Sequence, residues 1–212
     1  MSIHYYSGFF EGSLPVQMVE LLKSDIKDRK SIAMIWGWLP EEDLNFTKDV
    51  WLDPADIVFE EYHLIDRQIS KEKAHELLRN ASVILLLGGY TTLQNAFLAE
   101  YELDTPIKES NASVIMGFSA GAKNMAAKLI CVKSNGYTEA NGIYKGLGLG
   151  NFCYEPYFSQ DNNTLTQNDL LPLSQELDVY ATTDKSFLRV RDGEVSAFGD
   201  AYLISGSKIR KL

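Results

Sequence analysis

A serine flanked by small residues is the clearest candidate for chemistry in this sequence. Residues 117–121 read Gly-Phe-Ser-Ala-Gly and follow the apolar run Ala-Ser-Val-Ile at 112–115. Glycines two positions before and after a serine allow a sharp strand-to-helix turn that exposes the hydroxyl, as in a nucleophile elbow. Ser119 is therefore a candidate nucleophile. The alternative is that Ser119 only caps the following helix, because serine is a preferred residue at that position.

Backbone amides near Ser119 could bind the negative charge that develops when a hydroxyl attacks a carbonyl group. The amide of Ala120 begins the expected helix and is the first such donor. Gly88 and Gly89 close the apolar run at 82–89, and loops that follow adjacent strands of a doubly wound sheet open on the same edge. The pattern predicts an oxyanion hole made by these three residues. An ordinary strand-to-helix turn is an equally good interpretation of the glycine pair.

The elements that must position Ser119 follow from the spacing of apolar residues. Short apolar runs predict strands at 31–38, 56–64, 82–89 and 112–118. Helical spacing predicts helices at 13–28, 70–80 and 91–103 and in the segment that follows the elbow, 120–130, with Ser70 at a helix start. This alternation predicts an α/β fold in which a doubly wound, mostly parallel sheet is flanked by helices.

The last third of the chain has a different residue pattern. Residues 135–152 are rich in turn-forming residues, and the proline in 168–178 argues against a long helix there. The alternating segment 186–206 is interrupted by Asp192-Gly193 and by Gly199-Asp200, which predicts antiparallel hairpins at the C-terminal edge of the sheet. Since no linker or repeat interrupts the pattern, we expect one domain over residues 1–212.

Composition excludes several classes of function. The 212 residues carry a formal net charge of -9, which disfavours binding to nucleic-acid phosphates. Without an apolar stretch of about 18 residues or a signal-peptide pattern, the sequence predicts a cytoplasmic protein with no membrane contact. Three dispersed histidines and two cysteines lack the spacing of a metal site, so neither a metal nor a cofactor is expected.

Four segments together resemble the peptidase E (aspartyl dipeptidase) family of serine peptidases, with cyanophycinase as a more distant relative. They are residues 85–98 (LLLGGYTTLQNAFL), 117–126 (GFSAGAKNMA), 145–158 (KGLGLGNFCYEPYF) and 181–206, in the family's order. The resemblance implies a fold related to class I glutamine amidotransferases, a serine nucleophile and cleavage of short peptides with an N-terminal aspartate. A small peptide is the expected partner of a monomer or homodimer.

The resemblance also assigns site residues, and one of them is altered. It places the nucleophile at Ser119 and the acidic member of the triad at Asp184, for which a turn residue is an equal alternative. The family's histidine follows a proline, and Tyr157 occupies that position here. Tyr90 replaces an asparagine that relatives often carry after the glycine pair, and it would line the substrate pocket.

The missing histidine matters because a serine hydroxyl needs a base to take its proton during attack. A tyrosine, with a pKa of roughly 10, mostly donates at neutral pH. Two substitutes are conceivable: His63 reaching in from a neighbouring loop, or a Tyr157 phenolate favoured by Lys123. The sequence therefore leaves two hypotheses. One is a hydrolase of short peptides with an altered triad, and the other is an inactive pseudo-peptidase that binds a small peptide or metabolite.

Overall fold

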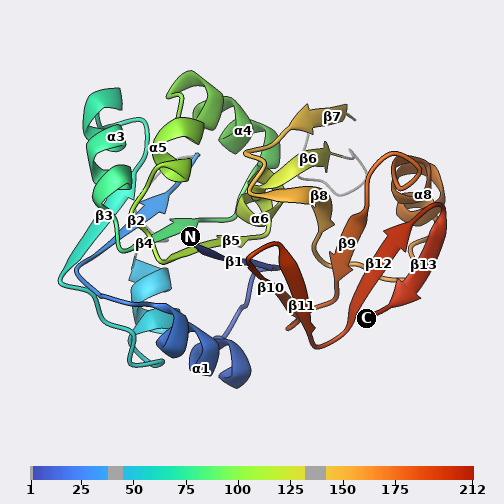
Figure 1. Ribbon diagram of the computed structural model, residues 1–212, viewed down its shortest axis with the longest axis horizontal. Coiled ribbons are helices and arrows are strands. Elements are labelled where there is room, and N and C mark those ends of the chain that lie inside the picture. Colours follow the sequence, from blue (N-terminus) through green and yellow to red (C-terminus); the bar gives the residue numbers. More distant parts are fainter. Residues whose placement is uncertain (1, 38–44, 132–141) are drawn as a thin grey trace.

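The computed structural model describes residues 2–37, 45–131 and 142–212. Strands in these ranges form two sheets that lie side by side (Figure 1). The predicted α/β class with a mostly parallel sheet is confirmed, whereas the second sheet is not expected from the sequence. No helix in the described ranges has the length and apolar character needed to cross a lipid bilayer.

The first sheet contains the parallel strands that lead to the elbow. In order across the sheet, its strands are β11 (Glu194–Phe198), β10 (Phe187–Arg191), β1 (Ile3–Ser7), β5 (Val114–Phe118), β4 (Val83–Leu86), β2 (Ser31–Ile35) and β3 (Glu61–Ile65). The five strands from β1 to β3 are parallel. Ser7 pairs with Phe118, and Leu86 pairs with Gly117. The carboxyl ends of β1, β4 and β5 therefore meet at one edge of the sheet.

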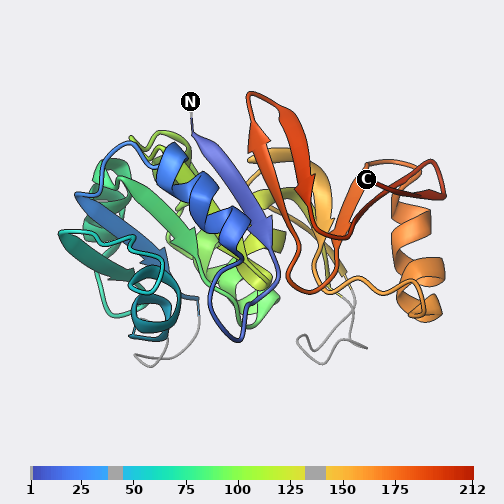
Figure 2. The same cartoon turned by 90° about the horizontal axis from the view of Figure 1, so that it is seen from below.

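Helices cover both faces of this sheet (Figure 2). One face carries α1 (Val16–Asp25) and the π-helical segment η1 (Thr47–Leu52), and the other carries α3 (Lys71–Asn80), α4 (Thr91–Glu100) and α5 (Asp104–Lys108). In β2, Ile32 and Met34 belong to the apolar cluster of α1, while Ala33 and Ile35 belong to the cluster of α3 and α4. The buried strand thus serves two cores, which explains why its sequence is apolar without alternation.

The second sheet has its own core. In order, its strands are β13 (Lys208–Lys211), β12 (Ala201–Ser205), β9 (Val179–Thr182), β8 (Gly150–Glu155), β6 (Ala126–Cys131) and β7 (Gly142–Lys145). A continuous helical run packs against it and consists of α7 (Asn163–Leu165), η3 (Thr166–Leu170) and α8 (Leu171–Leu173) (Figure 1). Pro172 is the second residue of α8, and the run ends one residue later, at Leu173. The expectation that no long helix forms at 168–178 is confirmed, since the helical residues of that segment end at Leu173.

Three other expectations about the elements need correction. The elbow helix α6 (Ala120–Met125) ends early, because residue 126 begins β6, which pairs with β7 and β8. The strand expected at 56–64 begins only at Glu61. Two other expected segments, the turn-rich 135–152 and the strand 31–38, lie partly outside the described residues. The Asp192-Gly193 turn closes the predicted β10–β11 hairpin, with φ of 52° and 82°. Gly199-Asp200 instead connects the two sheets, so it is not a hairpin turn.

Candidate active site

Ser119 lies between β5 and α6 in a strained backbone conformation. Its φ of 52° and ψ of -113° lie outside the regions that side-chain-bearing residues normally adopt. Its amide donates a hydrogen bond to the Ser7 carbonyl (2.8 Å), and its own carbonyl accepts one from the Lys123 amide (3.1 Å). Because its side chain makes no capping hydrogen bond to α6, the helix-cap interpretation is wrong. The hydroxyl is left for another purpose.

The glycines on either side of Ser119 are required for steric reasons. A Cβ at Gly117 would lie 2.6 Å from the Ala122 nitrogen, and a Cβ at Gly121 would lie 2.1 Å from the Leu86 carbonyl oxygen. Both clashes are with backbone atoms, which cannot rotate away. The small residues of the Gly-x-Ser-x-Gly pattern therefore let α6 pack directly against β4 and β5.

A pocket of about 1200 Å³ opens in front of the elbow. Five predicted site residues contribute to its lining: Ser119, Gly88, Gly89, Tyr157 and Asp184. The structure thus brings together residues from four separate segments of the sequence. The Gly88 Cα lies so close to the elbow that a Cβ there would be 3.4 Å from the Ser119 Cβ.

The other two predicted residues occupy different positions. Ala120 is buried directly behind Ser119, as the first residue of α6. Tyr90 is not among the pocket-lining residues. Gly89, with φ of 119°, turns the chain so that Tyr90 becomes the residue before α4, where its side chain is exposed. The expectation that Tyr90 lines the substrate pocket is therefore not met.

Tyr157 follows β8 and lines the same pocket as the glycine pair. Its backbone is also strained, with φ of 60°. Its hydroxyl oxygen accepts a hydrogen bond from the Phe9 amide (2.5 Å), and its ring lies against Gly8, where a Cβ would come within 2.7 Å of a ring carbon. Ser119, Tyr157 and Lys185 (φ of 63°) are thus three strained residues other than glycine that line one pocket, and such strain concentrates at functional sites.

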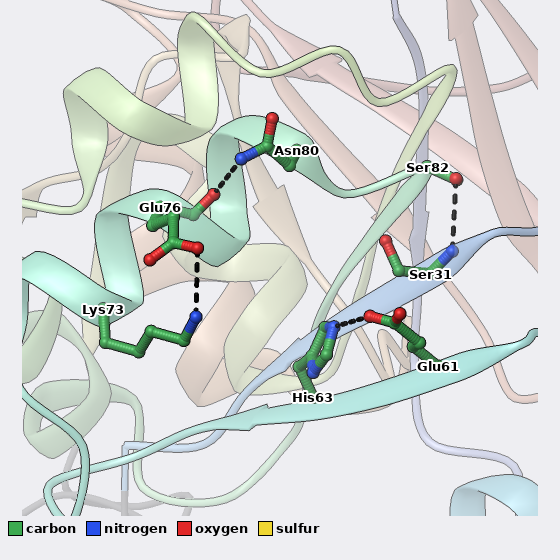
Figure 3. Close-up of polar contacts among 7 residues, drawn as sticks. All are labelled: Ser31, Glu61, His63, Lys73, Glu76, Asn80 and Ser82. Atoms are coloured by element: carbon green, nitrogen blue, oxygen red, sulfur yellow. Dashed lines mark hydrogen bonds and ion pairs between the residues drawn. The ribbon is translucent and has the colours of Figure 1, made fainter.

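None of the three histidines, all of which lie in the described ranges, lines the pocket. His63 lies on β3, at the far edge of the first sheet, and its Nε2 pairs with a Glu61 carboxylate oxygen at 3.0 Å (Figure 3). His4 contacts the Leu149 carbonyl, and His75 contacts the Tyr101 carbonyl. The idea that His63 could serve as the base is wrong, because two strands, β4 and β2, lie between β3 and β5.

A buried ion pair that sequence reasoning did not identify lies beside the elbow. Lys123 Nζ of α6 contacts a Glu155 carboxylate oxygen at 2.8 Å, and both side chains are more than nine-tenths buried. Burial raises the pKa of Glu155, although the charge and hydrogen bond of Lys123 oppose that shift. Lys123, which was considered as a cation for Tyr157, is thus held by Glu155. In the sequence, the one indication of this ion pair is the carboxylate of Glu155, which follows an apolar segment and directly precedes Pro156 and Tyr157.

Asp184 lies in the exposed turn between β9 and β10 and borders the pocket together with Lys185. Its backbone carbonyl accepts a hydrogen bond from the Ser186 hydroxyl at 3.4 Å. Asp184 is therefore a turn residue and a pocket residue at once.

A strained serine at the carboxyl edge of a parallel sheet, between a strand and a helix, is the arrangement of hydrolases with a nucleophile elbow. The chain belongs to peptidase family S51, whose sequence model matches residues 46–198. This confirms the resemblance to peptidase E.

Solved structures agree with this assignment at the level of the fold. A peptidase from an acI-B1 actinobacterium superposes with a TM-score of 0.70 and 19% identity, covering 100% of this chain and 94% of that chain. A putative peptidase E protein from Listeria monocytogenes EGD-e gives a TM-score of 0.68 and 16% identity, covering 94% of this chain and 98% of that chain. No curated protein matches the sequence.

Proposed function

We propose that this chain hydrolyses short peptides with Ser119 as the nucleophile, in an altered triad where Tyr157 stands in the histidine position and Asp184 supplies the acidic group. The observation that carries the proposal is the backbone of Ser119. A φ of 52° at a serine costs on the order of 1–3 kcal/mol. This strained turn leaves the Ser119 side chain only partly buried, among the residues that line the pocket.

In this reaction the Ser119 oxygen bonds to the carbonyl carbon of the peptide while its proton leaves for a base. The amides of Ala120 and of Gly88 or Gly89 stabilise the resulting oxyanion. The carbon–nitrogen bond then breaks, the amine departs with a proton, and water hydrolyses the acyl-enzyme. A neutral phenol is a poor proton acceptor, so we expect slow turnover limited by removal of the serine proton.

A second candidate is a pseudo-peptidase that binds a small peptide or metabolite without cleaving it. The observation that favours it is the absence of a histidine among the described pocket residues. In addition, the Tyr157 hydroxyl already accepts the Phe9 amide proton. Both candidates use the same pocket and differ only in the reactivity of Ser119.

A fluorophosphonate probe distinguishes the two candidates. The hydrolase predicts covalent labelling that peptide mass spectrometry maps to Ser119 and that Ser119→Ala abolishes. Ser13→Ala is the matched control, because it removes another hydroxyl from the pocket lining and should leave labelling unchanged. Absence of labelling at high probe concentration would support the pseudo-peptidase. Cleavage of Asp-initiated dipeptides, which the family resemblance implies, is measured alongside.

A further inference from the structure

One side of the pocket is built from aromatic rings. We call Phe9, Phe46 and Trp51 the aromatic wall, since all three line the pocket and contact one another. The ring centroids lie 5.3 Å apart for Phe9 and Phe46, 5.1 Å for Phe9 and Trp51, and 5.4 Å for Phe46 and Trp51. These separations are typical of favourable ring packing.

The wall is anchored through Trp51 and offers one exposed ring, that of Phe9. Trp51 is almost completely buried, and its indole nitrogen donates hydrogen bonds to the carbonyls of Phe10 and Gly12, both at 3.0 Å. The Phe9 side chain is 41% exposed. A ring that is fixed from behind and open in front binds a ligand without a large loss of conformational entropy.

Two neighbours of Ser119 link it to the wall. The Trp51 ring packs 4.4 Å from the ring of Phe118, the residue directly before Ser119. Phe9 comes two residues after Ser7, whose carbonyl holds the Ser119 amide. A peptide whose carbonyl carbon reaches Ser119 therefore has a neighbouring side chain within reach of the wall.

The charges around the pocket do not favour an acidic side chain. Among its described lining residues, the carboxylates are Glu11, Glu155 and Asp184, and the only ammonium group is that of Lys185. Lys185 is exposed in a surface turn next to Asp184. Glu155 is paired with Lys123, so among the described residues a bound aspartate would meet two unpaired carboxylates, Glu11 and Asp184, and one solvated positive charge.

We infer that the pocket selects short peptides with an aromatic or large apolar side chain beside the scissile bond, rather than an aspartate. Of this inference, only the position of the side chain relative to the cleaved bond rests on the proposed function. Binding to the wall does not require Ser119 to react.

The test uses the Ser119→Ala protein and titration calorimetry with four dipeptides: Phe-Ala, Ala-Phe, Asp-Ala and Ala-Asp. At least one aromatic dipeptide should bind roughly tenfold or more tightly than its acidic counterpart, because burial of a phenyl ring stabilises a complex by that order. Adding Phe9→Ala should remove most of this difference and leave the acidic dipeptides unaffected. Val58→Ala is the control, since it truncates an exposed apolar side chain outside the pocket lining.

The outcomes separate this inference from the proposed reaction. Tighter binding of an aromatic dipeptide with no cleavage by the unmodified protein would uphold the inference and contradict the hydrolase. Equal or tighter binding of the acidic dipeptides would overturn the inference, as would failure of all four to bind. The comparison of dipeptides uses an unaltered wall, so it decides the question even if Phe9→Ala fails to fold. In that case Phe9→Leu serves as the milder variant.

Discussion

Gly121→Ala should disturb the elbow by a predictable amount. The new Cβ would lie 2.1 Å from the Leu86 carbonyl oxygen and 2.5 Å from the Leu86 carbonyl carbon. These atoms belong to β4, which is buried and paired on both sides. Either α6 or β4 must therefore move by roughly 1 Å, and overpacking of this kind costs about 1–3 kcal/mol.

We expect the displacement also to change the position of the Ser119 hydroxyl relative to Gly88. A misplacement of about 1 Å in a reacting group can lower a rate on the order of 100-fold. Urea unfolding followed by tryptophan fluorescence measures the loss of stability, and the rate of fluorophosphonate labelling measures the loss of reactivity.

Gly12→Ala is the stability control for this experiment. A Cβ at Gly12 would meet nothing within 4 Å, so we expect its free energy of unfolding to change by less than about 0.5 kcal/mol. If Gly121→Ala unfolded at the same urea concentration as the unmodified protein and reacted equally fast with the probe, the steric account of the Gly-x-Ser-x-Gly pattern would be refuted.

Two further predictions concern buried charges. Burial alone would raise the pKa of Asp25, but hydrogen bonds from Arg189 (2.6 and 2.7 Å) and Tyr5 (2.5 Å) hold it below the usual 3.8. A lowered folded-state pKa means that this stabilisation is complete above about pH 4 and is lost as the pH falls further. Urea unfolding at decreasing pH should show that loss, and Asp25→Asn should flatten the profile; an equally steep profile in the variant would contradict the assignment. Lys123→Met leaves Glu155 buried without its partner and should lower the free energy of unfolding at neutral pH by about 3–5 kcal/mol. Recovery in the double variant with Glu155→Gln, measured the same way, tests the pairing, and no recovery would count against it.

The parallel half of the fold was predictable because its local and tertiary preferences agree. The apolar runs that became β2, β4 and β5 are buried on both faces, so they carry a strong signal. Ser70 was identified correctly as a helix start, and its hydroxyl accepts the Lys73 amide proton at 3.2 Å. The second sheet was not predictable, because residues 126–131 read as a continuation of a helix. Pairing with β7 and β8 overrides that local preference.

The candidate site was predictable where backbone geometry restricts the residue type. Gly117 and Gly121 indicate close contacts between strands and helix, and Gly89 indicates a backbone turn with a positive φ. The aromatic wall could not be found in this way, because Phe9 and Trp51 are far apart in sequence and resemble ordinary core residues. Their meeting depends on the loop between β1 and α1 folding back over η1.

The most direct test of the central claim is the activity of Tyr157→His. Histidine tolerates a positive φ better than most residues do, so the φ of 60° at this position does not prevent the exchange. If Ser119 is a nucleophile that lacks only a base, kcat/KM for cleavage of short peptides should rise roughly 100-fold or more, and Ser119→Ala in the same protein should abolish the gain. Activity that stays at the level of the unmodified protein, in a variant that folds normally, would contradict the claim.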